Sequence, residues 1–488
     1  MSTAPSPRLP FAMLMLLLVL GALDQTILST ATPVMARVLA GNWPIAWVFS
    51  AYLLAATVVI TLYGRLSDVH GRKPVLLLAL GLFLLGSLAC SLATDLRQIV
   101  LARALQGVGG GRLMTLSMLA VNDLYPAEEQ GPRKTQLGAA YGIATVFGPL
   151  AGGWLVQALS WHWAFLVNVP LAGLAWAVLA RTLPAAAPIR ANDEPSIDYA
   201  GALLLALALA ALLLATQHAR LGLPAWVSAG LLAAAGAKFT LGFLWRQRRA
   251  RQPLLPLSLF AQPAYAAASL LAVASGVALY AAVAFVPQYL QAGLHLAPSS
   301  AAWHLAPLML GLTAAAIAGG RLLRAQWPAA RLARLASLAM LASFLLLVAA
   351  LRWWPQQPLA LSAALLPLGA GLGLAFPVVT VVAQRTAPAQ HGGVATAVPV
   401  MLRSLGGAFG VALLAALLSH DVTEQMRAWQ AAPGMQGMGT AREAWCDAFA
   451  HGLQQVFYGG MVAALLAFAA SRWLPGRPHT AAGAPAVR

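Results

Sequence analysis

The acidic residue with the most unusual surroundings is Asp24, which interrupts an apolar run from Phe11 to about Pro33. The chain has 13 Asp and Glu residues, and the others fall in polar stretches or near the ends of apolar runs. An ionisable group inside a membrane is costly and usually functional. A carboxylate that is dry in one conformation and wet in another binds and releases a proton as the two exchange. Asp24 is therefore the best candidate for a proton-carrying group; the alternative is a packing aspartate satisfied by Thr26 or by a neighbouring backbone group.

A second buried charge is expected at Arg103, five residues into the apolar run 98–120. With a helix rise of about 1.5 Å per residue, Asp24 and Arg103 would each lie roughly 10 Å from the outer edge of a ~30 Å hydrocarbon core. At equal depth the two side chains could pair, and the arginine would then help to expel the proton from Asp24. The alternative is a structural arginine tied to backbone carbonyls.

Other residues are candidates for the wall of a substrate cavity, because adaptable apolar and aromatic side chains with a few polar groups suit broad specificity. Arg112 would lie about 8 Å from the inner edge of the membrane and Arg403 near its middle. For Arg112 we favour snorkelling to the cytoplasm or a bond to Asp123; for Arg403 a cavity role and a structural role are both open. Because the spans contain so few acidic residues, we expect the substrates to be neutral, zwitterionic or anionic amphipathic compounds. The full candidate set is Tyr52, Arg112, Met114, Phe285, Tyr289, His304, Met401 and Arg403.

The composition indicates which kind of element must position these groups. Of the 488 residues, 60% are hydrophobic and only 9% are charged, whereas soluble proteins carry roughly 25% charged residues. Lipid is therefore the expected solvent. The net charge of +17 would suit nucleic acid in a soluble chain, but here the basic residues form short clusters between apolar runs, as in a protein that faces anionic lipids.

Apolar runs of about 20 residues, the length that crosses a bilayer, recur along the whole chain and predict an all-α polytopic membrane protein with 14 transmembrane helices. The first run is too long for a signal-peptide core and is interpreted as an uncleaved helix. The expected spans are 11–33, 44–63, 74–93, 98–120, 135–157, 164–183, 199–216, 224–244, 264–290, 299–320, 332–351, 358–383, 393–419 and 451–474.

The distribution of Lys and Arg predicts the orientation of these spans. With the N-terminus in the cytoplasm, 20 of the 30 basic residues fall in inside segments, six outside and four within spans. This asymmetry obeys the positive-inside rule and places both termini in the cytoplasm. One missed or extra span would reverse every later loop and abolish the asymmetry, so the count of spans is expected to be even.

The chain also looks internally repeated. A glycine- and arginine-containing connection follows the second span (64–73) and the tenth (320–324), and the fifth and thirteenth spans are both glycine-rich. The first six spans would then match the last six, in the parallel-repeat design of transporters whose halves rock about a central site. The predicted domains are a six-helix bundle (1–190), an inserted pair of helices (191–255) and a second six-helix bundle (256–488) with an outside loop near 419–450.

Five segments, in order along the chain, carry a resemblance to a known family. They are Leu23–Ile27 followed by Pro33, the connection GRLSDVHGRK at Gly64–Lys73, the run Leu101–Gly111, the run Gly148–Gly153 and the segment Trp161–Pro170. Together they resemble the major facilitator superfamily and, within it, the fourteen-helix drug:proton antiporters. The resemblance also gives Arg103 a role in proton coupling.

The resemblance implies a gating role for the connection between the second and third spans, through Gly64, Asp68, Gly71, Arg72 and Lys73. In the family such a connection ties the two halves together on the cytoplasmic side. Asp68 and Arg72 would be one helical turn apart if the connection is helical. The alternative is a simple positive-inside anchor, which suits the basic residues but not Asp68.

The antiporter helix motif is represented by Gly148, Pro149, Gly152 and Gly153 in the fifth span. These residue types permit close helix packing and a local kink. Bending at this position could seal one side of a cavity; tight packing without movement is the alternative.

The function that these features favour is proton-coupled efflux of hydrophobic or amphipathic small molecules such as drugs, by alternating access. Two alternatives are open: a proton-coupled importer or uniporter of a metabolite on the same fold, and a non-transporting membrane sensor or assembly subunit. No nucleotide loop, metalloprotease motif or nucleophile elbow suggests an enzyme. We expect no cofactor, no metal site and no nucleic-acid partner, a monomer in the bacterial inner membrane, and two unrelated thiols at Cys90 and Cys446 rather than a disulfide.

Overall fold

A helix, or a pair of consecutive helices, occupies each of the predicted apolar ranges. The computed structural model describes residues 7–39, 45–111, 113–184, 198–215, 225–250, 253–386, 392–431 and 438–475, and these residues form no β-strand. The helices are α1 (Arg8–Val38), α2 (Trp47–His70), α3 (Arg72–Ser91), α4 (Leu96–Gly110), α5 (Leu113–Leu124), α6 (Ala127–Ala158), α7 (Trp163–Leu166), α8 (Asn168–Thr182), α9 (Tyr199–Ala215), α10 (Ala225–Arg249), η2 (Leu257–Ala261), α11 (Pro263–Gln288), η3 (Tyr289–Gly293), α12 (Pro298–Trp303), α13 (Ala306–Arg324), α14 (Ala329–Trp353), α15 (Pro358–Thr386), α16 (Gly392–Ala431), α17 (Met438–Ala470) and η5 (Ser471–Trp473).

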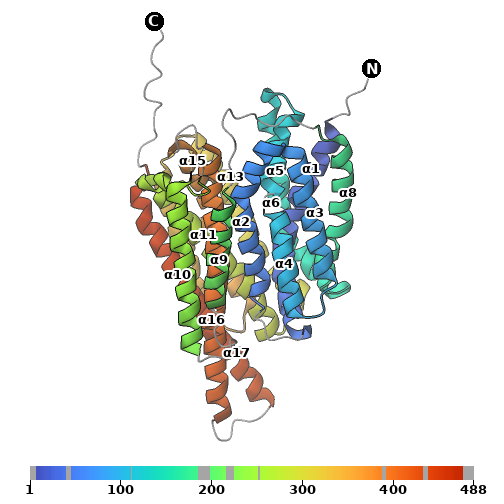
Figure 1. The fold of residues 1–488 in the computed structure, drawn as a ribbon. Helices are drawn as coiled ribbons and strands as arrows, with labels where there is room; N and C mark the ends of the chain where they lie inside the picture. Colours follow the sequence, from blue (N-terminus) through green and yellow to red (C-terminus); the bar gives the residue numbers. More distant parts are fainter. Residues whose placement is uncertain are drawn as a thin grey trace.

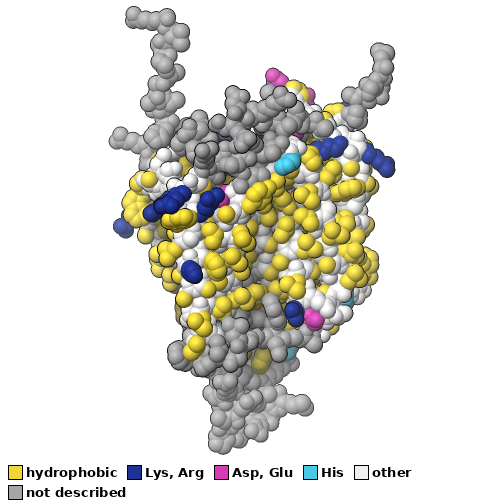
Figure 2. Space-filling model, viewed as in Figure 1, with side chains coloured by type: hydrophobic (Ala, Val, Ile, Leu, Met, Phe, Trp, Pro, Cys, Tyr) yellow, Lys and Arg dark blue, Asp and Glu magenta, His cyan; other side chains and the backbone are white. Residues whose placement is uncertain are grey.

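Nine helices in the described ranges are long and apolar enough to cross a membrane, or ten if the bent helix α6 is included. Their lipid-facing character is visible on the surface, where large apolar side chains such as Leu78, Leu310 and Leu345 are exposed. Figure 2 shows apolar side chains over the middle of the visible face, with Lys and Arg mostly gathered near one end. The protein is therefore an all-helical, multi-pass membrane protein, and the exact number of crossings stays a prediction.

The same pattern of helix packing occurs twice. In the first part of the chain α1 packs on α6 and α8, α2 on α4, and α3 on α4 and α8; in the last part α11 packs on α16 and α17, α13 on α15, and α14 on α15 and α17. Helices α9 and α10 pack on each other, and α9 also lies against α2. The two sets meet where α2 contacts α16 and where α6 contacts α12 and α13. Helix α1 begins and α17 ends at the same end of the bundle (Figure 1).

Two expected loops are helical. Helix α2 continues to His70, seven residues beyond the predicted span, and only Gly71 separates it from α3. The expected outside loop 419–450 is also wrong as a loop, because α16 continues to Ala431 and α17 already begins at Met438. Figure 1 shows these ends of α16 and α17 extending beyond the other helices. Polar residues stop an apolar run without stopping a helix, so hydropathy locates the membrane segment and not the helix end.

Candidate functional site

The Asp24 carboxylate lies at the centre of a buried polar cluster formed by side chains of α1, α4 and α8. Asp24 is 2% exposed and accepts three hydrogen bonds: from Arg103 Nη1 at 2.9 Å, from Gln106 Nε2 at 2.7 Å and from Asn168 Nδ2 at 3.0 Å. These partners come from α4 and from the first residue of α8. The structure therefore places Asp24 and Arg103, which sequence depth predicted to be close, in direct contact.

Arg103 is itself 1% exposed and uses several of its donors. Besides Asp24, the guanidinium group donates to Gln106 Oε1 at 2.6 Å and to the Val48 carbonyl at 3.2 Å. The Tyr52 ring covers it, with 4.1 Å from the guanidinium carbon to the ring centroid. Thr26, considered above as a partner of Asp24, instead donates to the Ala22 carbonyl. A charge pair with this many bonds satisfies the demands of a buried site.

Small residues bring the helices of this cluster together. A Cβ atom at Gly86 would lie 2.5 Å from Gln106 Cα, and one at Gly111 would lie 2.6 Å from Ala56 Cα. The glycines of the run Leu101–Gly111 thus allow α2, α3 and α4 to approach closely enough for the short side chains of the cluster to meet.

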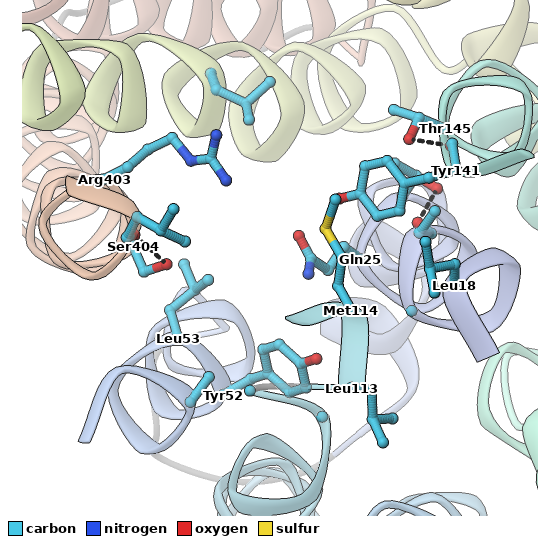
Figure 3. A pocket seen from close by; sticks show the side chains of 18 of the residues that line it. Leu18, Gln25, Tyr52, Leu53, Leu113, Met114, Tyr141, Thr145, Arg403 and Ser404 are labelled. Carbon is cyan, nitrogen blue, oxygen red and sulfur yellow. Dashed lines mark hydrogen bonds between the residues drawn. The ribbon is translucent and has the colours of Figure 1, made fainter. Parts of the chain in front are cut away.

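A cavity of about 160 Å³ lies next to this cluster, between the two sets of helices. Figure 3 shows Tyr52, Met114, Tyr141 and Gln25 around it, with Arg403 on the other side. Two of the polar lining residues are joined by a hydrogen bond: the Tyr280 hydroxyl donates to Gln25 Oε1 at 3.2 Å, which links α11 to α1. Neither Asp24 nor Arg103 lines the cavity, although Gln25, the neighbour of Asp24, and Tyr52 both do.

Three predicted cavity residues, Tyr52, Met114 and Arg403, line this space. Four others do not, and for two of these, Phe285 and Met401, the reason is the rotation of their helices. Successive residues are about 100° apart around a helix, so Phe285 and Met401, each two positions from a lining residue (Val283 and Arg403), point elsewhere and are buried.

The remaining two residues of this group have partners of their own. The Tyr289 hydroxyl donates to the Pro355 carbonyl at 2.6 Å, and His304 Nδ1 lies 2.6 Å from the Ser362 hydroxyl. Arg112 lies outside the described residues, so its predicted position is not tested.

In the predicted gating connection, Arg72 contacts a neighbouring helix. Gly71 adopts a φ of 85° that favours glycine, and it separates α2 from α3, so Asp68 and Arg72 do not lie on one continuous helix. Arg72 Nη1 instead lies 2.5 Å from Asp123 Oδ1 and also donates to the Leu119 carbonyl at 3.2 Å, both on α5. Lys73 is half-buried, and the surroundings of Gly64 and of the Asp68 side chain lie outside the described part.

Helix α6 is bent by 44° between Thr145 and Phe147. Pro149 explains the bend, because its ring lacks an N–H and clashes with the carbonyl four residues earlier, at Thr145. The motif glycines pack tightly below it: Gly148 against the Thr26 side chain, and Gly152 with a Cβ position 2.7 Å from Ile27 Cα.

Gly153 faces the other set of helices, since a Cβ there would lie 2.8 Å from Ser299 Cα on α12. The predicted kink and close packing therefore occur together, at a place where α6 contacts helices of both sets.

Sequence reasoning missed several members of the site. Gln106 and Asn168 were seen only as parts of motifs, and Gln25, Tyr141, Tyr280 and Phe376 were not singled out. The three amide residues could have been identified from the sequence, because Gln25, Gln106 and Asn168 interrupt apolar runs much as Asp24 does.

The two cysteines, Cys90 and Cys446, are both buried and are not joined in a disulfide. Within the described ranges there is also no group of three or more His, Cys, Asp or Glu side chains that could hold a metal ion.

Comparison with known proteins gives one consistent result. The family model described as "Major Facilitator Superfamily" matches residues 14–411. The chain is 35% identical over 420 residues to an MFS-type transporter of Mycobacterium tuberculosis, covering 85% of this chain and 60% of that relative. It is also 28% identical over 447 residues to multidrug resistance protein 3 of Bacillus subtilis, covering 90% of this chain and 86% of that protein.

Solved structures show the same fold at low identity. A peptide transporter aligns with a TM-score of 0.65 at 15% identity, covering 95% of this chain and 96% of that one. An inward-facing bacterial homologue of the human lysosomal transporter Spinster aligns with a TM-score of 0.62 at 16% identity, covering 97% and 98%. At these identities the likeness establishes the fold alone.

Proposed function

The chain belongs to the Major Facilitator Superfamily, and we propose that it exports hydrophobic or amphipathic small molecules, including drugs, in exchange for protons. Relatives named as multidrug transporters support export as the direction. The chain spans about 60% of the length of the mycobacterial relatives, so the transported compounds are part of the proposal.

The proposed architecture has 14 transmembrane helices in a 6+2+6 arrangement, with residues 1–190 and 256–488 as the two bundles and 191–255 as the inserted pair. The repeated packing of α1, α6 and α8 as α11, α16 and α17 supports this division. The basic residues near the end at which α1 begins support cytoplasmic termini (Figure 2). A monomer in a bacterial inner membrane, driven by the proton gradient without a cofactor, completes the proposal.

The observation that carries the proposal is the buried Asp24–Arg103 pair beside a central cavity. A proton that reaches Asp24 neutralises the carboxylate, and the attraction to Arg103 falls. The guanidinium still has the Val48 carbonyl and Gln106 Oε1 as acceptors. Loss of the third partner lets Arg103 and the Tyr52 ring that covers it move together. Because Tyr52 also lines the cavity, protonation changes the shape of the space in which a substrate sits.

Alternating access requires contacts between the bundles that break on one side. The Gln291 amide donates to the Thr30 carbonyl at 3.1 Å, and the Ser50 hydroxyl donates to the Ala408 carbonyl at 3.0 Å. Both bonds join α1 or α2 to the second set of helices. They are single, uncharged hydrogen bonds, each contributing about 0.5–1.5 kcal/mol, and are thus easily exchanged during opening.

The test is transport in proteoliposomes containing the purified protein. An imposed pH gradient, acidic inside, should drive accumulation of compounds from a chemical panel in inverted molecules, with alkalinisation of the lumen that follows substrate entry. Collapse of the gradient with nigericin should abolish both signals. Accumulation that follows the proton inward would identify a symporter, and a panel without any gradient-dependent flux would contradict the proposed function.

A further inference from the structure

Arg403 differs from the buried charges Asp24 and Arg103 because it is only half-buried and faces the cavity. Among the residues that line this space in the described part of the chain, it is the one with a charged side chain. Figure 3 shows its guanidinium group directed toward the side that carries Gln25 and Tyr141. The backbone beneath it is held in place, because the Arg403 carbonyl packs directly against Gly276 of α11. Its position is thus fixed by helix packing.

The N–H donors of the Arg403 guanidinium group are not used by the residue that contacts it. Its guanidinium carbon lies 4.4 Å from the centroid of the Phe376 ring. No hydrogen bond or ion pair joins it to another described residue, whereas Arg103 has acceptors from Asp24, Gln106 and Val48. An arginine inside a membrane is costly unless it faces water or a partner, and its planar fork fits a carboxylate with two parallel bonds.

The charge of the cavity is also unbalanced. The buried acid Asp24 is neutralised by Arg103 and does not line the space. A negatively charged compound in the cavity would therefore be attracted by Arg403 and would meet no carboxylate of the lining. A cation would be repelled by Arg403 and would find no carboxylate to pair with. Coulomb attraction is strong here because the surroundings have a low dielectric constant.

The remaining wall suits an apolar, preferably aromatic, body. The rings of Tyr52, Tyr141, Tyr280 and Phe376 surround the space, and Met114 contributes an adaptable thioether. The Phe376 ring lies against the guanidinium group, so an aromatic body bound at Phe376 would place a short side arm at Arg403.

We propose that the cavity binds amphipathic organic anions, with Arg403 holding a carboxylate and the aromatic side chains holding the apolar body. The inference rests on the proposed transport function and narrows its substrate class. Arg403 acts as a specificity-determining residue, because it separates compounds that share a body and differ in charge.

The experiment compares three probes with the same naphthalene ring: 2-naphthylacetate, its neutral amide and the 2-(2-naphthyl)ethylammonium cation. Binding is measured by fluorescence with the full chain in phosphatidylcholine nanodiscs, which contain no anionic lipid. Wild type should bind the carboxylate about tenfold or more tightly than the amide, and the cation most weakly, as expected for a charge-assisted bond.

Variants then assign the preference to one side chain. Arg403→Gln should weaken carboxylate binding by about 10–100-fold and leave amide binding within roughly twofold. Arg403→Lys should keep part of the preference, since it retains charge and loses the fork. The control is Arg385→Gln, which removes the same charge from an exposed position on α15 and should bind all probes as wild type does.

The outcomes separate this inference from the proposed function. Equal binding of the three probes by wild type, a preference for the cation, no binding of any probe, or an unchanged carboxylate preference in Arg403→Gln would each overturn the inference. The probe series in wild type decides it even when a variant does not fold. Gradient-driven flux of the amide in proteoliposomes containing the same purified protein would show that transport stands although the substrate class is wrong.

Discussion

The Arg103 guanidinium group lies 2.9 Å from the Asp24 carboxylate, and the Tyr52 ring is the side chain that contacts this pair and also lines the cavity. The charges are therefore shielded from the substrate space by one aromatic residue. This arrangement separates the group proposed to carry protons from the group proposed to hold substrate, Arg403, and the two can be tested independently.

Replacement of Asp24 by Asn should uncouple transport from the proton gradient. The amide keeps the size of the side chain but cannot bind and release a proton near neutral pH. Gradient-driven accumulation in proteoliposomes should fall at least tenfold, whereas exchange of labelled for unlabelled substrate should persist. Glu128→Gln, at an exposed position on α6, is the matched control; equal accumulation by Asp24→Asn and the control would refute the coupling role.

Removal of the Arg103 charge should destabilise the protein through Asp24. Arg103→Gln leaves a buried carboxylate without its counter-charge, a change that costs about 3–5 kcal/mol. Adding Asp24→Asn removes the stranded charge, so the double variant should recover part of that loss. Unfolding of both variants in detergent measures the effect. Strictly additive losses would mean that the pair contributes no coupling energy.

The contact between Arg72 and Asp123 should be exchangeable by charge reversal. Arg72→Asp or Asp123→Arg alone replaces the attraction across this contact by repulsion between like charges and should reduce transport severalfold. The double variant restores an ion pair and should regain a substantial part of the activity. The side chains are 22% and 12% exposed, so solvent screening limits the expected effect on stability to about 1 kcal/mol. A double variant no more active than either single one would show that the pair has no role in gating.

The packing of α6 on α1 should tolerate no side chain at Gly152. A Cβ atom there would lie 2.7 Å from both Ile27 Cα and Thr30 Oγ1, so Gly152→Ala should cost about 1–3 kcal/mol and reduce transport. Gly138→Ala on the same helix meets no atom within 4 Å and should be neutral or slightly stabilising, because alanine favours helix. Comparable melting temperatures for the two variants would contradict the packing argument.

The predicted orientation can be measured at the two ends of the span formed by α12 and α13. Ala297 and Ala325 are both exposed and lie just outside it. Ala297→Cys should react with a membrane-impermeant maleimide from outside intact cells, and Ala325→Cys only in inverted vesicles. Wild type is the control, since Cys90 and Cys446 are buried. The opposite labelling pattern would reverse the proposed topology.

The helical ranges were predictable because lipid demands long apolar runs, and a run of that length is visible in one sequence. The ends of the helices were less predictable, because polar residues are compatible with a helix outside the bilayer. Helix α2 thus continues to His70 and α16 to Ala431. The depth of Asp24 and Arg103 followed from counting residues, and the structure brings them together.

The rotation of each helix was not predictable in the same way. Depth is a one-dimensional quantity, whereas lining a cavity depends on direction around the axis. Met114 and Arg403 face the space and Phe285 and Met401 do not, although all four fall in apolar spans. The contacts of Asp24 with Gln106 and Asn168 depend on how α1, α4 and α8 meet, which is set by long-range packing.

In the proposed mechanism, the substrate and the proton-carrying pair lie on opposite sides of the Tyr52 ring. A compound that presses on the ring restricts the torsions by which it can leave Arg103, and a guanidinium that tilts carries the ring into the space a compound would fill. Occupancy and protonation then compete for a single rotamer. The proposed coupling therefore needs no extended chain of residues between the two sites, because Tyr52 contacts Arg103 and also lines the cavity.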